Sequence, residues 1–197
     1  TAKTKTNEKG RIISVDKNIV RKLRESGVST EMKSLESCDW VVLYEENGII
    51  GGAAGMGGMF NVSGIQLNEN FRGRGIGKKI QKELIDESCR RGYSFITVFN
   101  DPGNTSSVKL HDSLGYEKLF RIHYSKGIVN DVKGISFDKK GKLLIGLLRI
   151  FNTKIGTVAL AISLKILKTS FPKLIIYDED ELPSPDIKWI VNNFEKI

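Results

Sequence analysis

The chain has 197 residues and a formal net charge of +8, with 40% apolar and 27% charged residues. This balance is ordinary for a globular chain that can bury a substantial core. Only Cys38 and Cys89 are cysteines and neither has metal-ligand spacing, so we expect two reduced, buried or half-buried thiols in a cytoplasmic protein and no metal site. The Lys-rich start has no apolar core, and we do not expect a secretory signal.

The positive charge gathers in three regions, residues 1–24, 72–92 and 139–168. Such clusters can attract nucleic acid or an anionic membrane surface. The sequence shows no nucleic-acid module pattern, however, and aromatic residues do not alternate with the basic ones. We therefore expect a solvated basic surface outside the middle cluster and no nucleic-acid partner.

The first forty residues predict two or three short elements. Residues 11–15 favour a strand, and Asp16 can cap a helix that carries Ile19, Val20 and Leu23 on one face and ends at Gly27. A second short helix is expected over residues 29–35.

Apolar runs at 40–44 and 49–53 flank Asn47-Gly48, which is a strong hairpin signal because both turn residues need positive φ. The second arm is unusual, since five glycines fall between residues 51 and 58. Glycine in a strand often marks a bulge or the close approach of a ligand. The arm therefore either lines an acceptor-substrate cleft or forms a flexible hairpin tip.

A turn rich in glycine and cations lies at residues 72–79, between an apolar strand at 62–67 and a helix that ends near residues 90–92. The first turn of a helix leaves backbone N–H groups without partners, and the helix dipole adds positive charge there. Glycine lets the backbone approach a ligand closely. These features predict a phosphate or pyrophosphate site, with a basic solvated turn as the alternative.

The spacing in this turn excludes two common phosphate loops. A Rossmann pattern starting at Gly73 would need glycine at position 78, where Lys78 stands, and a Walker loop would need Ser or Thr at the position of Lys79. The pattern R-x-x-G-x-G is met by Arg72, Gly75 and Gly77. It resembles the pyrophosphate loop with which the GNAT superfamily of N-acetyltransferases holds coenzyme A.

A second stretch strengthens the resemblance. Residues 104–116 read NTSSVKLHDSLGY and are similar to the other GNAT signature, N-x-x-S/A followed by leucine, an aromatic residue or His, and L-G-F/Y. The two signatures occur in the family's order, with one expected strand at 93–99 between them. The resemblance covers roughly residues 10–137.

The resemblance implies an α+β fold, with a mixed, mostly antiparallel central sheet flanked by helices, and acetyl-CoA as acetyl donor. Residues 116–124 and 128–137 would form the last two strands of this sheet. The central strand at 62–67 would splay from its neighbour, so that its free backbone groups pair with the pantetheine arm. The positions matching cofactor-binding sites are Ile65, Leu67, Arg72, Gly73, Arg74, Gly75, Ile76, Gly77, Lys78, Asn104, Ser107 and Lys109.

The resemblance also suggests the catalytic groups. An N–H near Leu67 would polarise the thioester carbonyl. His111 stands where many family members carry the tyrosine thought to protonate the leaving thiolate, and it either donates that proton or packs beside the cofactor. No general base is evident, so a water ordered by Asn61, Asn100 or His123 accepts the amine's proton, or the amine arrives neutral.

Residues 1–138 are interpreted as the GNAT-like domain and 139–197 as a C-terminal extension beyond the resemblance. Helices are expected at 142–151 and 157–167, a strand at 171–177, and a last helix begun by Ser184-Pro185-Asp186. That helix would place Ile187, Ile190, Val191 and Phe194 on one face. Arg149, Asn152, Lys154 and Gly156 interrupt the apolar stretch 143–167, so no membrane span is expected.

Helices that are apolar nearly all round are expected to be buried. Packing on the domain is the first expectation for this extension, a homodimer interface the second and attachment to a membrane surface the third. For the whole chain, the leading hypothesis is acetyl transfer to a primary amine by direct attack in a ternary complex. The alternative is a CoA-binding regulatory or interaction module that has lost catalysis. The acceptor, a small molecule or a peptide, is left open.

Overall fold

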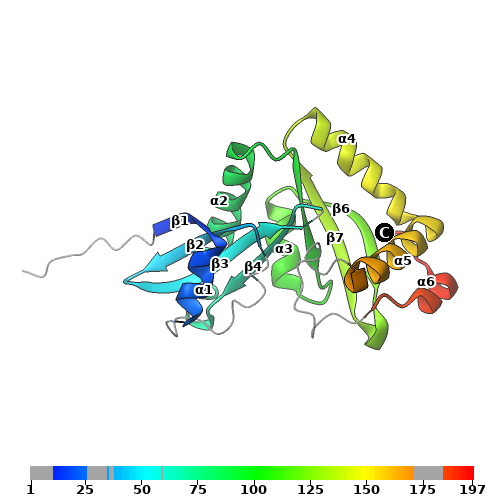
Figure 1. The fold of residues 1–197 in the computed structure, drawn as a ribbon, viewed down its shortest axis with the longest axis horizontal. Helices are drawn as coiled ribbons and strands as arrows, with labels where there is room; N and C mark the ends of the chain where they lie inside the picture. The colour runs from blue at the N-terminus through cyan, green and yellow to red at the C-terminus, as the bar shows by residue number, and fades with distance from the viewer. Residues whose placement is uncertain (1–10, 26–34, 36–37, 59, 171–183) are drawn as a thin grey trace, which may run out of the picture.

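A computed structural model describes residues 11–25, 35, 38–58, 60–170 and 184–197. Seven strands form one sheet in the order β1-β2-β3-β4-β5-β7-β6 (Figure 1). Their bounds are Arg11–Asp16 (β1), Trp40–Glu46 (β2), Ile49–Gly57 (β3), Val62–Leu67 (β4), Phe95–Asn100 (β5), Glu117–His123 (β6) and Val129–Ser136 (β7). Sequence patterns had predicted each of these strands within a few residues.

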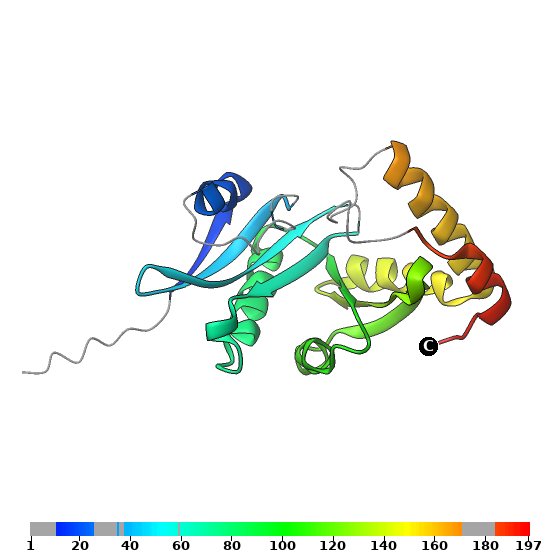
Figure 2. The same cartoon turned by 90° about the horizontal axis from the view of Figure 1, so that it is seen from below.

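All neighbouring strands in the sheet are antiparallel except β4 and β5, which are parallel. This parallel pair is short, because only Val62 faces Thr97 and Ser63 faces Val98 before the strands separate. Figure 2 shows the two halves of the sheet diverging, with α2 and α3 on either side of the gap. The mixed, mostly antiparallel sheet confirms the expected α+β class.

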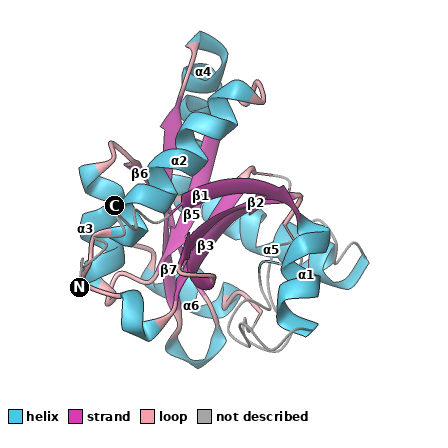
Figure 3. Ribbon diagram, turned by 90° about the vertical axis from the view of Figure 1, so that its left-hand side faces the viewer, coloured by secondary structure: helices cyan, strands magenta, loops and turns pink. Residues whose placement is uncertain are grey.

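Helices lie on both sides of the sheet (Figure 3). They span Lys17–Glu25 (α1), Ile76–Arg90 (α2), Thr105–Ser113 (α3), Lys139–Leu148 (α4), Lys154–Ser170 (α5) and Ile187–Asn193 (α6), with short 3₁₀ turns at Glu69–Phe71, Ser125–Gly127 and Arg149–Asn152. Ile76, Ile80 and Leu84 of α2 pack with Val42, Ala54 and Ile96 of the strands in the largest core cluster. Apolar spacing on α2 therefore fixes the helix against the sheet.

The hairpin between β2 and β3 confirms the Asn-Gly signal, since Asn47 and Gly48 have φ of 56° and 73°. The glycine-rich arm is not a flexible tip. It forms the nine-residue strand β3 in the middle of the β1–β4 half, and most of it is buried.

The β3 glycines are explained by close packing. A Cβ on Gly51 would lie 2.4 Å from the Phe71 ring, and one on Gly55 would lie 2.3 Å from Cys38 Sγ. Neither glycine lines the cleft described below. The alternative of a flexible tip is therefore wrong, and Gly51 and Gly55 have a packing role; the hypothesis that this arm lines an acceptor cleft stays a prediction.

The C-terminal helices share a core with the last strands. Ile145 of α4 and Leu160 of α5 pack with Phe120, Ile122 and Val132 of β6 and β7. This cluster combines residues from both sides of the domain boundary predicted at residue 138. The boundary itself stays a prediction. The expected helix at 29–35 and strand at 171–177 lie largely or wholly outside the described residues.

The expected burial of these helices is only half right. Their inner sides are buried, but several large apolar side chains on α4, α5 and the turn between them are exposed. In α6, Asp186 is the N-cap, Ile190 is buried, and Val191 is exposed instead of sharing the buried face. Among the described residues no helix alone has the length and hydropathy of a membrane span; Lys139–Asn152 and Lys154–Leu167 reach them only together, across a 99° bend.

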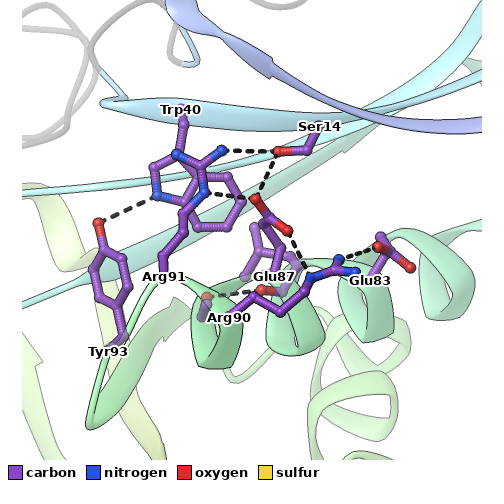
Figure 4. Close-up of polar contacts among 9 residues, drawn as sticks. Ser14, Trp40, Glu83, Glu87, Arg90, Arg91 and Tyr93 are labelled. Carbon is purple, nitrogen blue, oxygen red and sulfur yellow. Dashed lines mark hydrogen bonds and ion pairs between the residues drawn. The ribbon is translucent and has the colours of Figure 1, made fainter.

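The C-terminal end of α2 is tied to the first two strands by a polar network (Figure 4). Glu87 accepts hydrogen bonds from Arg91 Nε at 2.7 Å and Ser14 Oγ at 3.3 Å, and pairs with Arg90 Nε at 2.8 Å. The Arg91 guanidinium also lies 4.4 Å from the centre of the Trp40 ring. These contacts fix the direction of α2, and therefore the place of its opposite end.

Candidate active site

A cleft of about 720 Å³ opens where β4 and β5 separate. Its walls come from β4, from the turn and first residues of α2, and from the start of α3, so both sequence signatures meet in one place. The lining residues are Ile65, Gln66, Leu67, Arg72, Gly73, Gly75, Gly77, Lys78, Asn104, Ser106, Ser107 and Leu110. Nine of them are predicted positions, and the additional three are Gln66, Ser106 and Leu110.

The backbone of β4 presents unpaired groups to this cleft. The N–H of Asn68 donates to Gly51 of β3, at 3.0 Å, and Ser63 pairs with Val98 of β5 on the other side. Backbone direction alternates along a strand, so the N–H and C=O groups of Ile65 and Leu67 point the same way as those of Ser63. Because β5 has already turned away, these groups face the gap, as the sequence predicted.

The N-terminus of α2 contributes a second set of donors. Gly75 is the N-cap and lies in the left-handed region, with φ 73° and ψ 5°. The first helical hydrogen bond runs from Lys79 N–H to the Gly75 carbonyl, at 3.3 Å. The N–H groups of Ile76, Gly77 and Lys78 therefore precede the helical ladder and have no acceptor within the helix. Together with the helix dipole they form an anion-binding end.

Glycine is needed at two of these positions for different reasons. At Gly75 the positive φ favours glycine, while a Cβ there would meet no atom within 4 Å. At Gly77 a Cβ would lie 3.1 Å from Leu67 Cδ1, which is tight. Gly77 thus allows α2 to approach β4 closely, and this closeness brings the helix end to the strand's open edge.

The cations around the turn are not equivalent. Arg72 and Lys78 are exposed and line the cleft. Arg74 does not line it; its guanidinium binds Glu46 of β2 at 2.6 and 2.9 Å and lies 5.0 Å from the Phe71 ring centre. Arg74 would have to leave Glu46 before its side chain could reach a ligand. Ile76 is buried in the core, so only its backbone N–H can contribute.

Helix α3 forms the other wall. Asn104 is its N-cap, accepting a hydrogen bond from Ser107 N–H at 3.0 Å. Ser106, Ser107 and Leu110 face the cleft. The four-residue spacing of Ser106 and Leu110 is a signal that could have identified both. Lys109 is exposed and does not line the cleft.

His111 lies one residue beyond this wall and is only 3% exposed. Its Nδ1 is 2.9 Å from the Ser107 carbonyl oxygen and 3.1 Å from Asn100 Nδ2, whereas Nε2 is buried and has no hydrogen-bond partner. Burial, above all, lowers the pKa of His111 to about 4. The imidazole is therefore neutral at pH 7 and carries a single N–H.

A buried polar set lies next to His111. The His111 and Tyr116 rings meet edge to face with centroids 5.1 Å apart. Gln81 of α2 donates to the Tyr116 hydroxyl at 2.9 Å and to Ser63 Oγ at 3.1 Å. The set joins α2, the end of α3 and the point where β4 leaves β5. It therefore holds both walls of the cleft at a fixed separation.

No activated nucleophile accompanies this geometry among the described residues. Cys38 is buried, and burial raises the pKa of its thiol to about 12; the pKa of Cys89, which is exposed rather than half-buried, is also raised by desolvation. Such thiols are protonated at neutral pH and unreactive. The described residues also contain no group of three or more His, Cys, Asp or Glu side chains able to hold a metal ion.

The three residues considered for ordering a water have other partners. Asn61 Nδ2 donates to the Phe95 carbonyl at 3.1 Å, and Asn100 contacts His111. His123 stacks on Trp189 of α6 with ring centroids 3.7 Å apart. None of the three lines the cleft, and the water-ordering role stays a prediction.

Comparison with known proteins agrees with this arrangement. Residues 56–125 match the family model described as FR47-like protein, a segment that runs from the end of β3 through both walls of the cleft. An L-methionine sulfoximine/L-methionine sulfone acetyltransferase of Salmonella typhimurium is 31% identical over 84 residues, which are 39% of this chain and 49% of that protein. The L-amino acid N-acyltransferase MnaT of Escherichia coli is 30% identical over the same shares. The chain thus spans about half the length of these curated relatives.

Solved structures share the fold at lower identity. The structure of yncA from Salmonella typhimurium with its cofactor acetyl-CoA has a TM-score of 0.53 at 18% identity, covering 66% of this chain and 95% of that one. A GNAT superfamily phosphinothricin acetyltransferase from Sinorhizobium meliloti, in complex with AcCoA, has a TM-score of 0.52 at 17% identity, covering 66% and 89%. The chain shares the fold of these acetyltransferase structures, including one from the GNAT superfamily. Its residues 56–125, which build the cleft, are similar to the FR47-like family.

Proposed function

We propose that this protein is an acetyl-CoA-dependent N-acetyltransferase that transfers the acetyl group directly to a primary amine in a ternary complex. The observation that carries the proposal is the single cleft at the β4–β5 separation, in which both GNAT signatures and an unpaired strand edge converge. Residues far apart in sequence supply an anion-binding helix end, an open strand edge and a second helix end. Such a cleft suits a long ligand that carries phosphates at one end and amides along its length.

The donor would be held by backbone groups more than by side chains. The N–H groups of residues 76–78 would bind the diphosphate, with Arg72 and Lys78 adding charge. The open edge at Ile65 and Leu67 would pair with the pantetheine amides like an added strand. Asn104 and Ser107 would stand beside the cofactor at the start of α3. Arg74 and Lys109 would contribute at most long-range charge, since neither side chain lines the cleft.

In the transfer step the neutral amine nitrogen attacks the thioester carbonyl. The C–N bond forms, the C–S bond breaks, the amine gives up one proton and the coenzyme A thiolate takes one. The Leu67 N–H would donate to the developing oxyanion, an interaction worth roughly 3 kcal/mol in comparable sites. Positioning of the two reactants would supply several kcal/mol more. No covalent enzyme intermediate is required, which suits the protonated thiols described above.

The role of His111 depends on its tautomer. Donation of a proton to the thiolate from Nε2 requires that Nδ1 carry no proton. An unprotonated Nδ1 can accept a hydrogen bond from the Asn100 amide, whose Nδ2 lies 3.1 Å away. The Ser107 carbonyl at 2.9 Å instead favours a proton on Nδ1. Replacing His111 by Gln tests the acid role: kcat should fall about 100-fold with KM nearly unchanged. An unchanged kcat would restrict His111 to packing beside the cofactor.

An amino acid or a similar small amine is the acceptor class to try first. The two curated relatives are named for L-methionine sulfoximine and sulfone and for L-amino acids. A panel should therefore begin with free amino acids and their sulfone and sulfoximine derivatives, followed by peptide N-termini, lysine side chains, amino-sugars and polyamines. Thiol release from acetyl-CoA measures turnover for each.

Calorimetric titration with acetyl-CoA, and with coenzyme A lacking the 3′-phosphate, tests the donor. We expect binding of both, with competition between them; no binding of either would end the proposal. Binding without thiol release for any amine would instead favour the alternative of a CoA-binding module without catalysis. That alternative is not favoured at present, because the curated relatives are named as acyltransferases.

A further inference from the structure

The outer sides of the C-terminal helices carry a row of exposed apolar side chains, which we call the C-terminal apolar surface. Leu147 is 61% exposed and Ile155 is 85% exposed. Leu143 and Leu147 are four residues apart on α4, and Ile155, Ile162 and Ile166 fall on one side of α5. The members of the surface are Leu143, Leu147, Ile150, Ile155, Ile162 and Ile166.

The two parts of this surface meet at the turn between the helices, where the chain bends by 99°. A Cβ on Gly156 would lie 2.1 Å from the Ile150 carbonyl oxygen, so the start of α5 lies directly against the end of the 3₁₀ turn. Thr153 Oγ donates to the same carbonyl at 2.7 Å. Ile150 and Ile155 therefore flank a tight, hydrogen-bonded corner, and the exposed residues continue from one helix to the next.

The segment that carries this surface has charges of one sign in its sequence, although Arg149 is paired with Glu117 of β6. Residues 139–170 contain seven Lys and Arg residues and no Asp or Glu. The cations are Lys139, Lys140, Lys142, Arg149, Lys154, Lys165 and Lys168. A large apolar area rimmed by polar residues marks an interaction site on an otherwise polar surface. The lysine-rich helices favour an anionic partner, and their exposed leucine and isoleucine side chains favour an apolar one. A suitable partner therefore has both properties.

We propose that the C-terminal apolar surface docks the protein on an anionic phospholipid membrane. A second copy of the chain is a poorer occupant, because a symmetric contact through this surface would bring together two segments that are rich in lysine and contain no acidic residue. Phosphate headgroups supply the opposite charge, and the acyl boundary beneath them accepts leucine and isoleucine side chains. The proposal does not depend on the enzymatic function proposed above.

The inner faces of the helices determine how such docking would occur. Ile145 and Leu160 remain in the core with Phe120 and Val132. Docking therefore leaves α4 and α5 on the domain and inserts only the outer side chains. The helices would lie in the plane of the headgroups, in the manner of an interfacial helix.

Sedimentation of the full chain with vesicles tests the proposal. We expect binding to mixed phosphatidylcholine–phosphatidylserine vesicles, weak binding to phosphatidylcholine alone, and loss of binding at high salt. The variant Lys139→Glu/Lys142→Glu should lower partitioning roughly tenfold or more, because each cation near an anionic surface contributes about fivefold. Leu147→Ser should also lower it, roughly fivefold.

Matched variants separate this surface from the general positive charge. Lys79→Glu/Lys82→Glu makes the same charge change at the same spacing on the exposed side of α2, and Ile49→Ser removes an isoleucine that is 51% exposed at the β2–β3 hairpin. Both should bind vesicles within about twofold of the parent, given the short screening length at physiological salt. Equal losses in the two charge variants would overturn the proposal. So would absence of vesicle binding, or a dimer in analytical ultracentrifugation that Leu147→Ser dissolves.

Discussion

The two ends of α2 are built in opposite ways. At its C-terminus, Arg90 and Arg91 each bind Glu87, and Ser14 contacts both Glu87 and Arg91. The chain then leaves through Gly92. At its N-terminus the first N–H groups precede the helical ladder, and the nearby Arg72 is 60% exposed with only a 3.6 Å contact to Glu69. One end satisfies its polar groups internally, and the other leaves them for a ligand.

This difference shows how a helix can be both rigid and reactive. The closed end fixes the direction of the axis, so the open end does not need contacts of its own to stay in place. A preorganised set of donors loses little entropy when an anion binds. Both ends carry arginine next to glycine in the sequence, so composition alone does not separate them. Comparing matched changes at the two ends is therefore informative.

The largest effect is expected from the two glycines that flank the helix. Gly75 and Gly92 have φ of 73° and 80°, and a Cβ on either would meet no atom within 4 Å. Gly75→Val and Gly92→Val should each destabilise the fold by about 2 kcal/mol, because a β-branched residue is strained at positive φ. Only Gly75→Val should also weaken acetyl-CoA binding, roughly 100-fold, by misplacing about two charge-assisted hydrogen bonds.

Denaturant unfolding and calorimetric titration measure the two effects separately. Equal losses of affinity in the two glycine variants would show that stability, rather than the position of the amides, controls binding. That result would remove the proposed distinction between the ends.

A smaller effect should separate the two arginines of the turn. Arg72→Gln should raise the Kd for acetyl-CoA about fivefold to tenfold, since its side chain lines the cleft. Arg74→Gln should change the Kd less than about twofold, because Glu46 already holds that guanidinium. Titrations at low and high salt measure both. A larger loss for Arg74 would mean that its side chain leaves Glu46 when the cofactor binds.

The smallest effect concerns the closed end. The hydrogen bond from Arg91 lowers the pKa of Glu87, so its contribution to stability is present at neutral pH and is lost as the pH falls through the folded-state value. Glu87→Gln should cost about 1 kcal/mol at pH 7, and the cost should vanish only once the pH has fallen below the lowered folded-state pKa of Glu87. It should leave cofactor affinity unchanged. Unfolding curves over a pH series check this, with Glu69→Gln as the control. If the difference in unfolding free energy between the parent and Glu87→Gln stayed constant with pH, the account would be contradicted.

Local patterns predicted much of the fold. Val62–Leu67 was predicted with its observed bounds, and the Asn47–Gly48 turn has the positive φ values that its sequence requires. The resemblance, through its two signatures and the strand before the first of them, predicted nine of the residues that line the cleft. These successes share a cause: alternation, capping and turn chemistry act within a few residues, so a short segment contains all the information.

Prediction from the sequence failed where a side chain's contacts are made with residues far away in the chain. Nothing near Arg74 in the sequence shows that Glu46, 28 residues earlier, will bind it. Nothing near Gly51 and Gly55 in the sequence shows that Phe71 and Cys38 will pack against them. The sequence alone could not distinguish the exposed side of α5 from its buried side, since apolar residues occupy both.

The sequence alone determined where strands turn, where α2 begins, and which turn offers backbone amides to an anion. It did so through φ preferences, caps and periodicity, which depend on neighbouring residues. Only the tertiary structure decided which cation is engaged by a carboxylate, which glycines serve packing, and which apolar side chains remain exposed. These outcomes depend on what each side chain meets across the sheet, and pairing between remote segments is a property of the fold as a whole.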